Sequence, residues 1–104
     1  MNSQGKSQAL GTLKRKSKVV ATLLKQLSHP QRLLILCSLA ERELSVAEIE
    51  RACGASQSAV SQFLKAMRLE GLVESRRDGK NVFYKISDQR VNELMRSLYS
   101  IFCK

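Results

Sequence analysis

Histidine, long apolar runs and acidic residues are scarce in this sequence, and each shortage argues against a class of function. The chain has one histidine, His29, and no Ser/His/Asp set, glycine-rich phosphate loop or close pair of carboxylates. We therefore expect neither an enzyme nor a bound cofactor. The longest apolar run, Leu33 to Cys37, is far too short to span a bilayer, and the N-terminus lacks the apolar stretch of a secretory signal. These absences predict a cytoplasmic protein without a membrane segment.

The shortage of acids leaves a strong positive charge. Eighteen basic residues against nine acidic ones give a formal charge of +9, and no acid precedes Glu41. A small domain this basic usually meets a polyanion, either nucleic acid or an anionic membrane surface. A membrane binder would need a long amphipathic helix with a lysine-rich face and aromatic anchors. Here the charges are spread over several segments, which favours nucleic acid.

Two short helices joined by a glycine-centred turn are predicted between Ser45 and Arg68. Ser45 with Glu48 three residues later forms a capping box, Gly54 suits a left-handed helix end, and Ser56 can cap the second helix. That second helix combines an apolar stripe with a face of hydrogen-bonding side chains. Such a face is typical of a recognition helix in a DNA major groove, the alternative being an ordinary solvated helical hairpin. The residues expected to contact DNA from this helix are Gln57, Ser58, Ser61, Gln62, Lys65 and Arg68.

A basic β-hairpin is predicted directly after the helix pair. Strands are expected over residues 72–76 and 82–86, because Asp-Gly between two strand-like runs is a strong hairpin signal. A basic hairpin in this position is a wing, which lies along the phosphates or the minor groove of DNA. The expected phosphate contacts are Arg76, Arg77 and Lys80.

Further helices complete a mainly α fold with a β-hairpin wing. Residues 1–14, rich in Ser, Gln, Gly and Lys, are interpreted as a flexible basic tail. Residues 15–104 are interpreted as one winged helix-turn-helix domain for DNA binding and dimerisation. It would contain a helix over 16–27, a nearly all-apolar central helix over 30–40 that is buried on most sides, and a last helix from Ser87 or Asp88 to Cys103. The predicted order is helix, helix, helix, recognition helix, hairpin, helix.

The first and last helices carry more apolar surface than so small a core can easily hide. This predicts a two-fold homodimer through the terminal helices, the alternative being that both helices cap the monomer core. A two-fold dimer would bind a pseudo-palindromic site on double-stranded DNA. The expected interface residues are Val20, Leu23, Leu24, Leu94, Leu98, Ile101 and Phe102.

Several motifs, taken in order, resemble the ArsR/SmtB family of dimeric winged helix-turn-helix repressors. Metal-sensing members of that family use a Cys-x-Cys pair beside the first helix of the motif, or a His/Asp/Glu set on the last helix. Residues 43–48 hold no cysteine and the last helix holds no histidine, so we expect no metal site, and we expect His29 to start a helix. The resembling motifs are Leu27-Ser28-His29-Pro30-Gln31-Arg32-Leu33, Leu44-Ser45-Val46, Ser56-Gln57, Val60-Ser61-Gln62, Gly71-Leu72-Val73 and Phe83-Tyr84.

Cys37 and Cys103 resemble the cysteine pair of the family's reactive-sulfur-sensing branch, which includes the BigR, SqrR and YgaV types. The resemblance implies a repressor that binds DNA with both thiols reduced. It also implies that a reactive sulfur species or oxidant, as effector, links the thiols directly or through added sulfur atoms and releases the DNA. In a neighbouring HlyU-like branch, the same cysteines belong to an activator that displaces a silencing protein. The remaining alternative is a winged-helix regulator in which both cysteines, like Cys53, are only packing residues.

Overall fold

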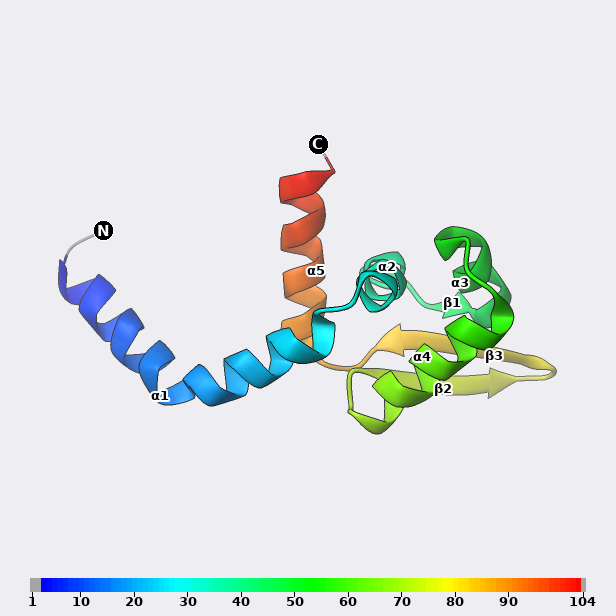
Figure 1. Cartoon of the computed structure of the whole chain (residues 1–104), viewed down its shortest axis with the longest axis horizontal. Helices are drawn as coiled ribbons and strands as arrows, with labels where there is room; N and C mark the ends of the chain where they lie inside the picture. Colours follow the sequence, from blue (N-terminus) through cyan, green and yellow to red (C-terminus); the bar gives the residue numbers. More distant parts are fainter. Residues whose placement is uncertain (1–2, 104) are drawn as a thin grey trace.

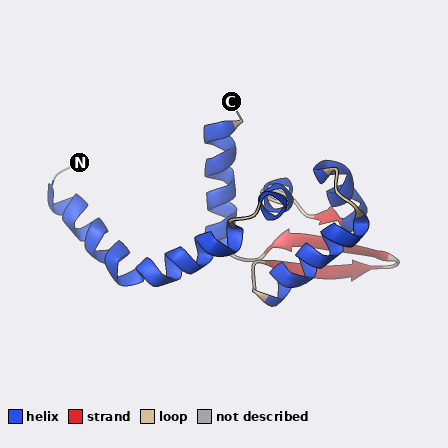
Figure 2. Ribbon diagram, viewed as in Figure 1, coloured by secondary structure: helices blue, strands red, loops and turns tan. Residues whose placement is uncertain are grey.

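The computed structural model describes residues 3–103 and shows a bundle of short helices beside a small sheet, with one long helix leading away from it (Figures 1 and 2). Except for the two-residue strand β1, the order of elements is the predicted one. No helix in the described part of the chain is long and apolar enough to cross a membrane. The elements are α1 (Ser3–Leu27), α2 (Pro30–Ser38), β1 (Leu44–Ser45), α3 (Val46–Cys53), α4 (Gln57–Leu69), β2 (Val73–Asp78), β3 (Asn81–Ile86) and α5 (Gln89–Phe102).

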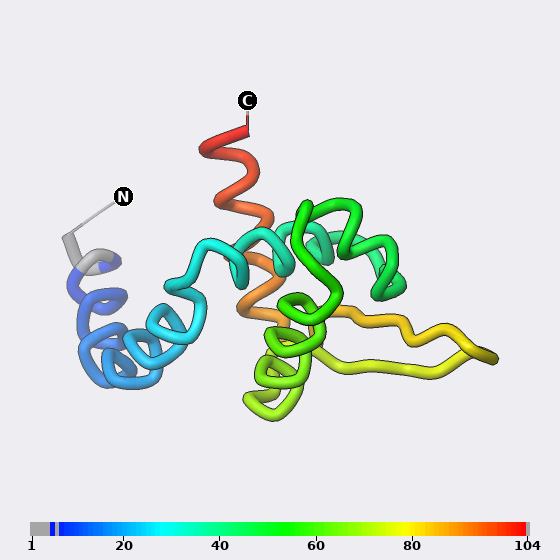
Figure 3. The backbone as a smooth tube through the Cα atoms, turned by 45° about the vertical axis from the view of Figure 1, so that its right-hand side comes forward, coloured from blue at the N-terminus to red at the C-terminus, as the bar shows by residue number. Residues whose placement is uncertain are grey.

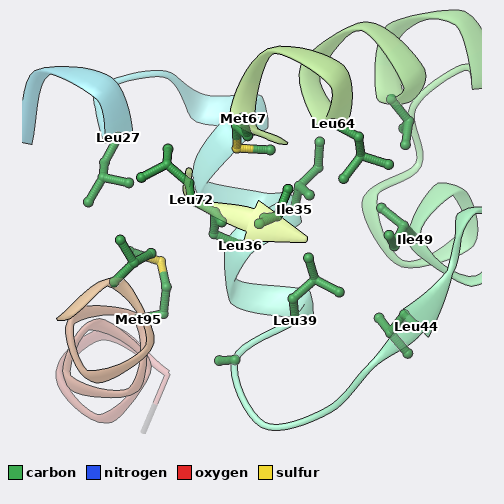
Figure 4. Close-up of a cluster of buried hydrophobic side chains, with 14 of the residues drawn as sticks. Leu27, Ile35, Leu36, Leu39, Leu44, Ile49, Leu64, Met67, Leu72 and Met95 are labelled. Carbon is green, nitrogen blue, oxygen red and sulfur yellow. The ribbon is translucent and has the colours of Figure 1, made fainter. Parts of the chain in front are cut away.

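The hydrophobic core forms around α2 (Figure 4). Ile35 and Leu36 are fully buried, and they share one cluster with Met67 of α4 and Met95 of α5. Leu34 on the same helix is 49% exposed. The helix is therefore buried on most sides, as expected, and only the face that carries Leu34 is left uncovered among residues 3–103.

The three strands form an antiparallel sheet in the order β1-β3-β2. Leu44 of β1 pairs with Tyr84 of β3, a contact between segments far apart in the sequence that local signals did not predict. The hairpin pairing of β2 and β3 continues out to Asp78 and Asn81, so both strands extend further than predicted. Gly79 takes a φ of 63° in the two-residue loop between them, as tight hairpin turns require. The resulting wing projects from the body of the molecule (Figures 1 and 3).

Helix α1 corrects the expectation of a flexible N-terminal tail. The chain is helical from Ser3, so residues 3–14 continue the predicted helix by several turns, whereas residues 1–2 lie outside the described residues. Nothing in residues 3–14 interrupts a helix as a proline would, and extending an existing helix needs no new nucleation. A polar composition therefore did not prevent helix formation here.

Most of α1 packs against no other element among residues 3–103. Leu23 and Leu27 reach the core, whereas Leu10 and Leu13 are 67% and 51% exposed. The Cα radius of gyration is 15.9 Å, against about 13 Å for a compact chain of about 100 residues. The molecule is elongated because this helix extends away from the other elements (Figure 1).

Candidate DNA-binding surface and cysteine cluster

The predicted helix-turn-helix is formed by α3 and α4, and its caps are those the sequence indicated. The Ser45 amide donates to Glu48 Oε1 over 2.9 Å, and the Glu48 amide donates to Ser45 Oγ over 3.2 Å. Hydrogen bonding to the backbone and the side chain of Ser45 lowers the pKa of the Glu48 carboxyl. Gly54 ends α3 with a φ of 63°, and Ser56 Oγ accepts from the amide of Ala59 to begin α4. Local hydrogen bonds therefore define where both helices of the motif begin.

Helix α4 turns one face to the core and leaves the other to solvent. Val60, Leu64 and Met67 are buried, which fixes the rotation of the helix about its axis. Every α4 residue that was predicted to contact DNA lies on the remaining surface of the helix, where its side chain can reach base edges or phosphates. The exposed residues are Gln57, Ser58, Ser61, Gln62, Lys65 and Arg68.

The wing residues differ in their partners. Arg77 and Lys80 are exposed and have no hydrogen-bond or ion-pair partner among residues 3–103. Arg76 instead donates through Nε to Glu43 Oε1 over 2.8 Å, and its guanidinium lies 4.6 Å from the centre of the Phe83 ring. The hydrogen bond raises the pKa of Arg76 and lowers that of the Glu43 carboxyl. Arg76 thus holds the wing against the segment before β1, a role that the sequence did not reveal.

Two acidic residues that border this surface, Glu70 and Glu74, are each paired with a base. Glu70 accepts two hydrogen bonds from Arg32, one over 2.8 Å to Oε2, and the same guanidinium donates to the carbonyl of Gln26. Glu74 lies 3.1 Å from Lys85. Because these carboxylates are compensated, the unpaired bases dominate the electrostatic potential that DNA would meet.

The terminal helices present a mixed set of apolar residues. Among the predicted dimer residues, Leu24, Ile101 and Phe102 are exposed, at 51%, 62% and 78%. Leu23 is 8% exposed and belongs to the core of its own chain, which leaves little of it for a partner. Sequence reasoning did not single out Leu10 or Leu13, which are exposed on the part of α1 that was not predicted to be helical. The half-buried members of the predicted set are Val20, Leu94 and Leu98.

The three cysteines are all free, and Cys53 and Cys103 lie near enough to Cys37 to affect the pKa of its thiol. Cys37 is half-buried on α2, and its Sγ lies 3.7 Å from the sulfur of Met95. Burial raises the pKa of the Cys37 thiol, and the charges of Cys103 and Cys53 raise it further. The structure therefore brings the ends of α3 and α5 within electrostatic range of Cys37.

The surroundings of the other two thiols differ. Cys103 is exposed at the end of α5, where its amide donates to the carbonyl of Tyr99 over 2.9 Å. Cys53 packs against the core, and burial raises the pKa of its thiol, an effect opposed by a hydrogen bond with Ser38. A buried thiol forms less of the reactive thiolate at neutral pH, so Cys103 is the thiol most open to reagents from solvent.

Metal ligands do not gather in the described part of the chain: residues 3–103 contain no group of three His, Cys, Asp or Glu side chains able to hold an ion. His29 starts α2, as predicted, because its Nδ1 accepts from the amide of Gln31 over 3.1 Å. Its ring also lies 4.8 Å from the ring of Phe63, centre to centre.

Comparisons with known proteins agree with this geometry. A family model described as bacterial regulatory protein, arsR family, matches residues 29–75. The Biofilm growth-associated repressor of Xylella fastidiosa is 43% identical over 91 residues, which are 88% of this chain and 80% of that protein. The HTH-type transcriptional regulator YgaV of Escherichia coli is 42% identical over 95 residues, covering 90% and 96%. The Transcriptional activator HlyU of Vibrio cholerae is 36% identical over 101 residues, covering 97% and 94%.

Solved structures show the same fold. The transcriptional repressor BigR from Xylella fastidiosa superposes with a TM-score of 0.83 at 41% identity, covering 90% of this chain and 96% of that one. A homodimeric winged helix-turn-helix DNA-binding domain from Mycobacterium bovis gives a TM-score of 0.68 at 34% identity, covering 84% and 83%. With its capped recognition helix and basic wing, this chain belongs to the ArsR family and is a winged-helix transcriptional regulator rather than an enzyme.

Proposed function

We propose that this protein is a cytoplasmic, homodimeric repressor that leaves its operator when reactive sulfur or an oxidant links Cys37 to Cys103. The observation that carries the proposal is the proximity of an exposed thiol, Cys103, to a half-buried thiol on the central helix of the core. A link between them would join the end of α5 to α2. Relatives of this chain that are named as repressors, including the Biofilm growth-associated repressor, support the proposal that the DNA-bound protein lowers transcription.

The dimer is supported by apolar surface that the monomer leaves uncovered. Ile101 and Phe102 on α5 and Leu24 on α1 are more than half exposed, which is costly for large apolar side chains unless a partner covers them. The homodimeric relative from Mycobacterium bovis has the same fold. We infer that two copies pair through α1 and α5, which would place two α4 helices on one side of the dimer for two half-sites on DNA.

The linking reaction balances with an organic persulfide, R–S–SH, as the oxidant. One cysteine thiolate attacks the outer sulfur, forms a Cys–S–SH group and expels RS⁻, which takes up a proton. The second cysteine thiolate then attacks the sulfur bonded to the first cysteine and expels hydrosulfide. The two thiols lose two electrons, the transferred sulfur is reduced to hydrosulfide, and a Cys37–Cys103 disulfide remains. A peroxide would give the same bond through a sulfenic acid, with loss of water.

The link can control DNA binding because the helix that holds Cys37 contacts both the helix-turn-helix and the C-terminal helix α5. Cys37 lies on α2, which packs against α3 of the helix-turn-helix on one side and against α5 on the other. Drawing the end of α5 toward α2 would change the α5 surface that pairs with the partner. Half-sites lie about 34–36 Å apart, so a small rotation between subunits separates the recognition helices from their grooves.

The test is DNA binding by gel shift on a duplex selected from a random pool by the reduced protein, repeated after persulfide treatment. We expect treatment to abolish the shifted band and intact mass to show one intramolecular link. Cys37→Ser and Cys103→Ser should each bind DNA and keep binding it after treatment. Cys53→Ser is the matched control and should respond as wild type does. Unchanged binding with free thiols in treated wild type would reduce both cysteines to packing residues.

An activator is the second candidate, favoured by the relative named Transcriptional activator HlyU. Such a protein would use the same DNA-binding surface to displace a silencing protein. Transcription from the bound promoter with purified polymerase separates the two functions. A repressor lowers transcript on naked DNA, whereas an activator of this kind raises transcript only when a silencing protein is present.

A further inference from the structure

A pocket of about 1080 Å³ opens beside Cys37, between the C-terminal end of α2 and one flank of α5. Small-molecule sites in proteins measure about 300–1,000 Å³, so a molecule of that size fits. Cys37 lines this pocket and Cys103 does not. A small molecule in the pocket would therefore meet the half-buried thiol and not the exposed one.

Two positive and two negative side chains line the pocket. Glu41 and Arg42 come from the segment after α2, and Glu93 and Arg96 come from α5. Their formal charges cancel, so the pocket offers a site for a zwitterion and not a general attraction for anions. A carboxylate is held well by an arginine fork, and an ammonium by a carboxylate.

These charges remain available to a ligand. Arg96 Nε lies 3.3 Å from Glu41 Oε1, but both side chains are more than half exposed, and such surface pairs contribute little to stability. Among residues 3–103, Arg42 and Glu93 form no ion pair or side-chain hydrogen bond. Arg42 does lie close enough to Glu48 to help lower the pKa of that carboxyl. The pocket thus holds one unpaired charge of each sign, Arg42 from the segment after α2 and Glu93 from α5.

We propose that this pocket binds a low-molecular-weight persulfide carrying an amino-acid group and delivers its outer sulfur to Cys37. Arg42 would hold the carboxylate and Glu93 the ammonium, with the sulfur end directed at the thiol. This inference rests on the proposed linking of Cys37 to Cys103, and it identifies which effector the site would favour and which cysteine reacts first.

A held ligand solves a chemical difficulty at Cys37. Its burial disfavours the thiolate, so Cys37 would react slowly with a dilute reagent that meets it by chance. Binding raises the local concentration of the persulfide and orients the outer sulfur toward Sγ. The Cys37 thiolate then forms a bond to that sulfur, the S–S bond of the ligand breaks, and the thiol of the amino acid leaves. Cys103 next attacks Cys37 and expels hydrosulfide.

The binding test uses S-methyl-L-cysteine, a thioether that has the amino-acid group and cannot transfer sulfur. In a full-length Cys53→Ser/Cys103→Ser protein, only Cys37 can be alkylated by iodoacetamide, and intact mass gives the rate. We expect S-methyl-L-cysteine to slow alkylation. Arg42→Gln and Glu93→Gln should each weaken this protection about tenfold, the loss of one charged contact. Arg51→Gln, on the exposed face of α3 outside the pocket, should leave it unchanged.

The reaction test compares cysteine persulfide with inorganic disulfide on the same proteins. Cysteine persulfide should modify Cys37 faster than inorganic disulfide does, and Arg42→Gln should slow only the former. Two results would overturn the pocket assignment: absence of protection by S-methyl-L-cysteine, or an equal loss of rate in Arg42→Gln with both reagents. In either case persulfide would still link the cysteines and release DNA, so the proposed function would stand. Failure of any persulfide to release DNA from wild type, with protection intact, would instead refute the proposed function.

Discussion

At the wing, two adjacent arginines have different surroundings and should have different effects on DNA binding. Arg77 is exposed and has no partner among the described residues, whereas Arg76 is held by Glu43 and lies against Phe83. We expect Arg77→Ala to weaken binding to all duplexes alike and to reduce the salt slope of log K by about 0.9, one phosphate contact. Anisotropy titrations at several salt concentrations measure this slope.

The matched variant is Arg76→Ala. The Arg76 guanidinium is bound to Glu43. Removing the Arg76 side chain should therefore change the salt slope less than removing that of Arg77, and should loosen the wing instead. Equal slopes for the two variants would show that Arg76 leaves Glu43 to hold a phosphate. The sequence alone grouped both residues as phosphate contacts, because the partner of Arg76 lies 33 positions away and no local pattern reveals it.

Asp88 gives a residue-scale prediction for acid stability. Its carboxylate caps α5 and is paired with Arg90 through Nη2 over 2.7 Å, which lowers its pKa from the usual 3.8. A folded-state pKa below the unfolded one gives stability that is present above pH 3.8 and is lost as the pH falls through the folded value. Asp88→Asn keeps a good cap but cannot titrate, so its free energy of unfolding should fall less in acid. Urea unfolding at several pH values tests this, and parallel pH curves for the two proteins would contradict it.

At the scale of single elements, local signals predicted the helix-turn-helix well. Ser45 and Ser56 cap α3 and α4 as expected, and Gly54 ends α3 in the left-handed conformation. Local sequence was enough here because each boundary depends on hydrogen bonds within three or four residues. Strand β1 was missed because its two residues become a strand through pairing with β3, and the length of α1 was missed because no buried face marks it.

Gly54 provides the element-scale prediction. Its φ of 63° strains any residue with a Cβ, although no atom lies within 4 Å of the position that a Cβ would take. We expect Gly54→Ala to lower the free energy of unfolding by about 1 kcal/mol or slightly more, through backbone strain alone. Gly54→Asn should cost less, because Asn tolerates this conformation better. Equal losses for Ala and Asn in urea unfolding would point to a cause other than backbone conformation.

At the scale of the whole molecule, the elongated shape and the exposed apolar residues of α1 and α5 support the inferred homodimer. Phe102 is 78% exposed on α5, and a charge at that position would be buried in the inferred interface. We expect Phe102→Glu to shift the protein from dimer to monomer in sedimentation velocity. Leu69→Glu is the matched control, since Leu69 is 76% exposed on α4 outside the terminal helices. A dimer that survives Phe102→Glu would place the interface elsewhere.

The most direct test of thiol control compares one protein in two covalent states. Reduced protein and purified Cys37–Cys103-linked protein would be titrated with the same selected duplex by fluorescence anisotropy, and the linked sample titrated again after reduction with dithiothreitol. We predict that the reduced protein binds tightly and that the link weakens binding at least about a hundredfold, or about 2.7 kcal/mol. Reduction of the linked protein should restore the original affinity in full. Equal affinity of the linked and reduced proteins would contradict the proposal that this thiol pair controls operator binding.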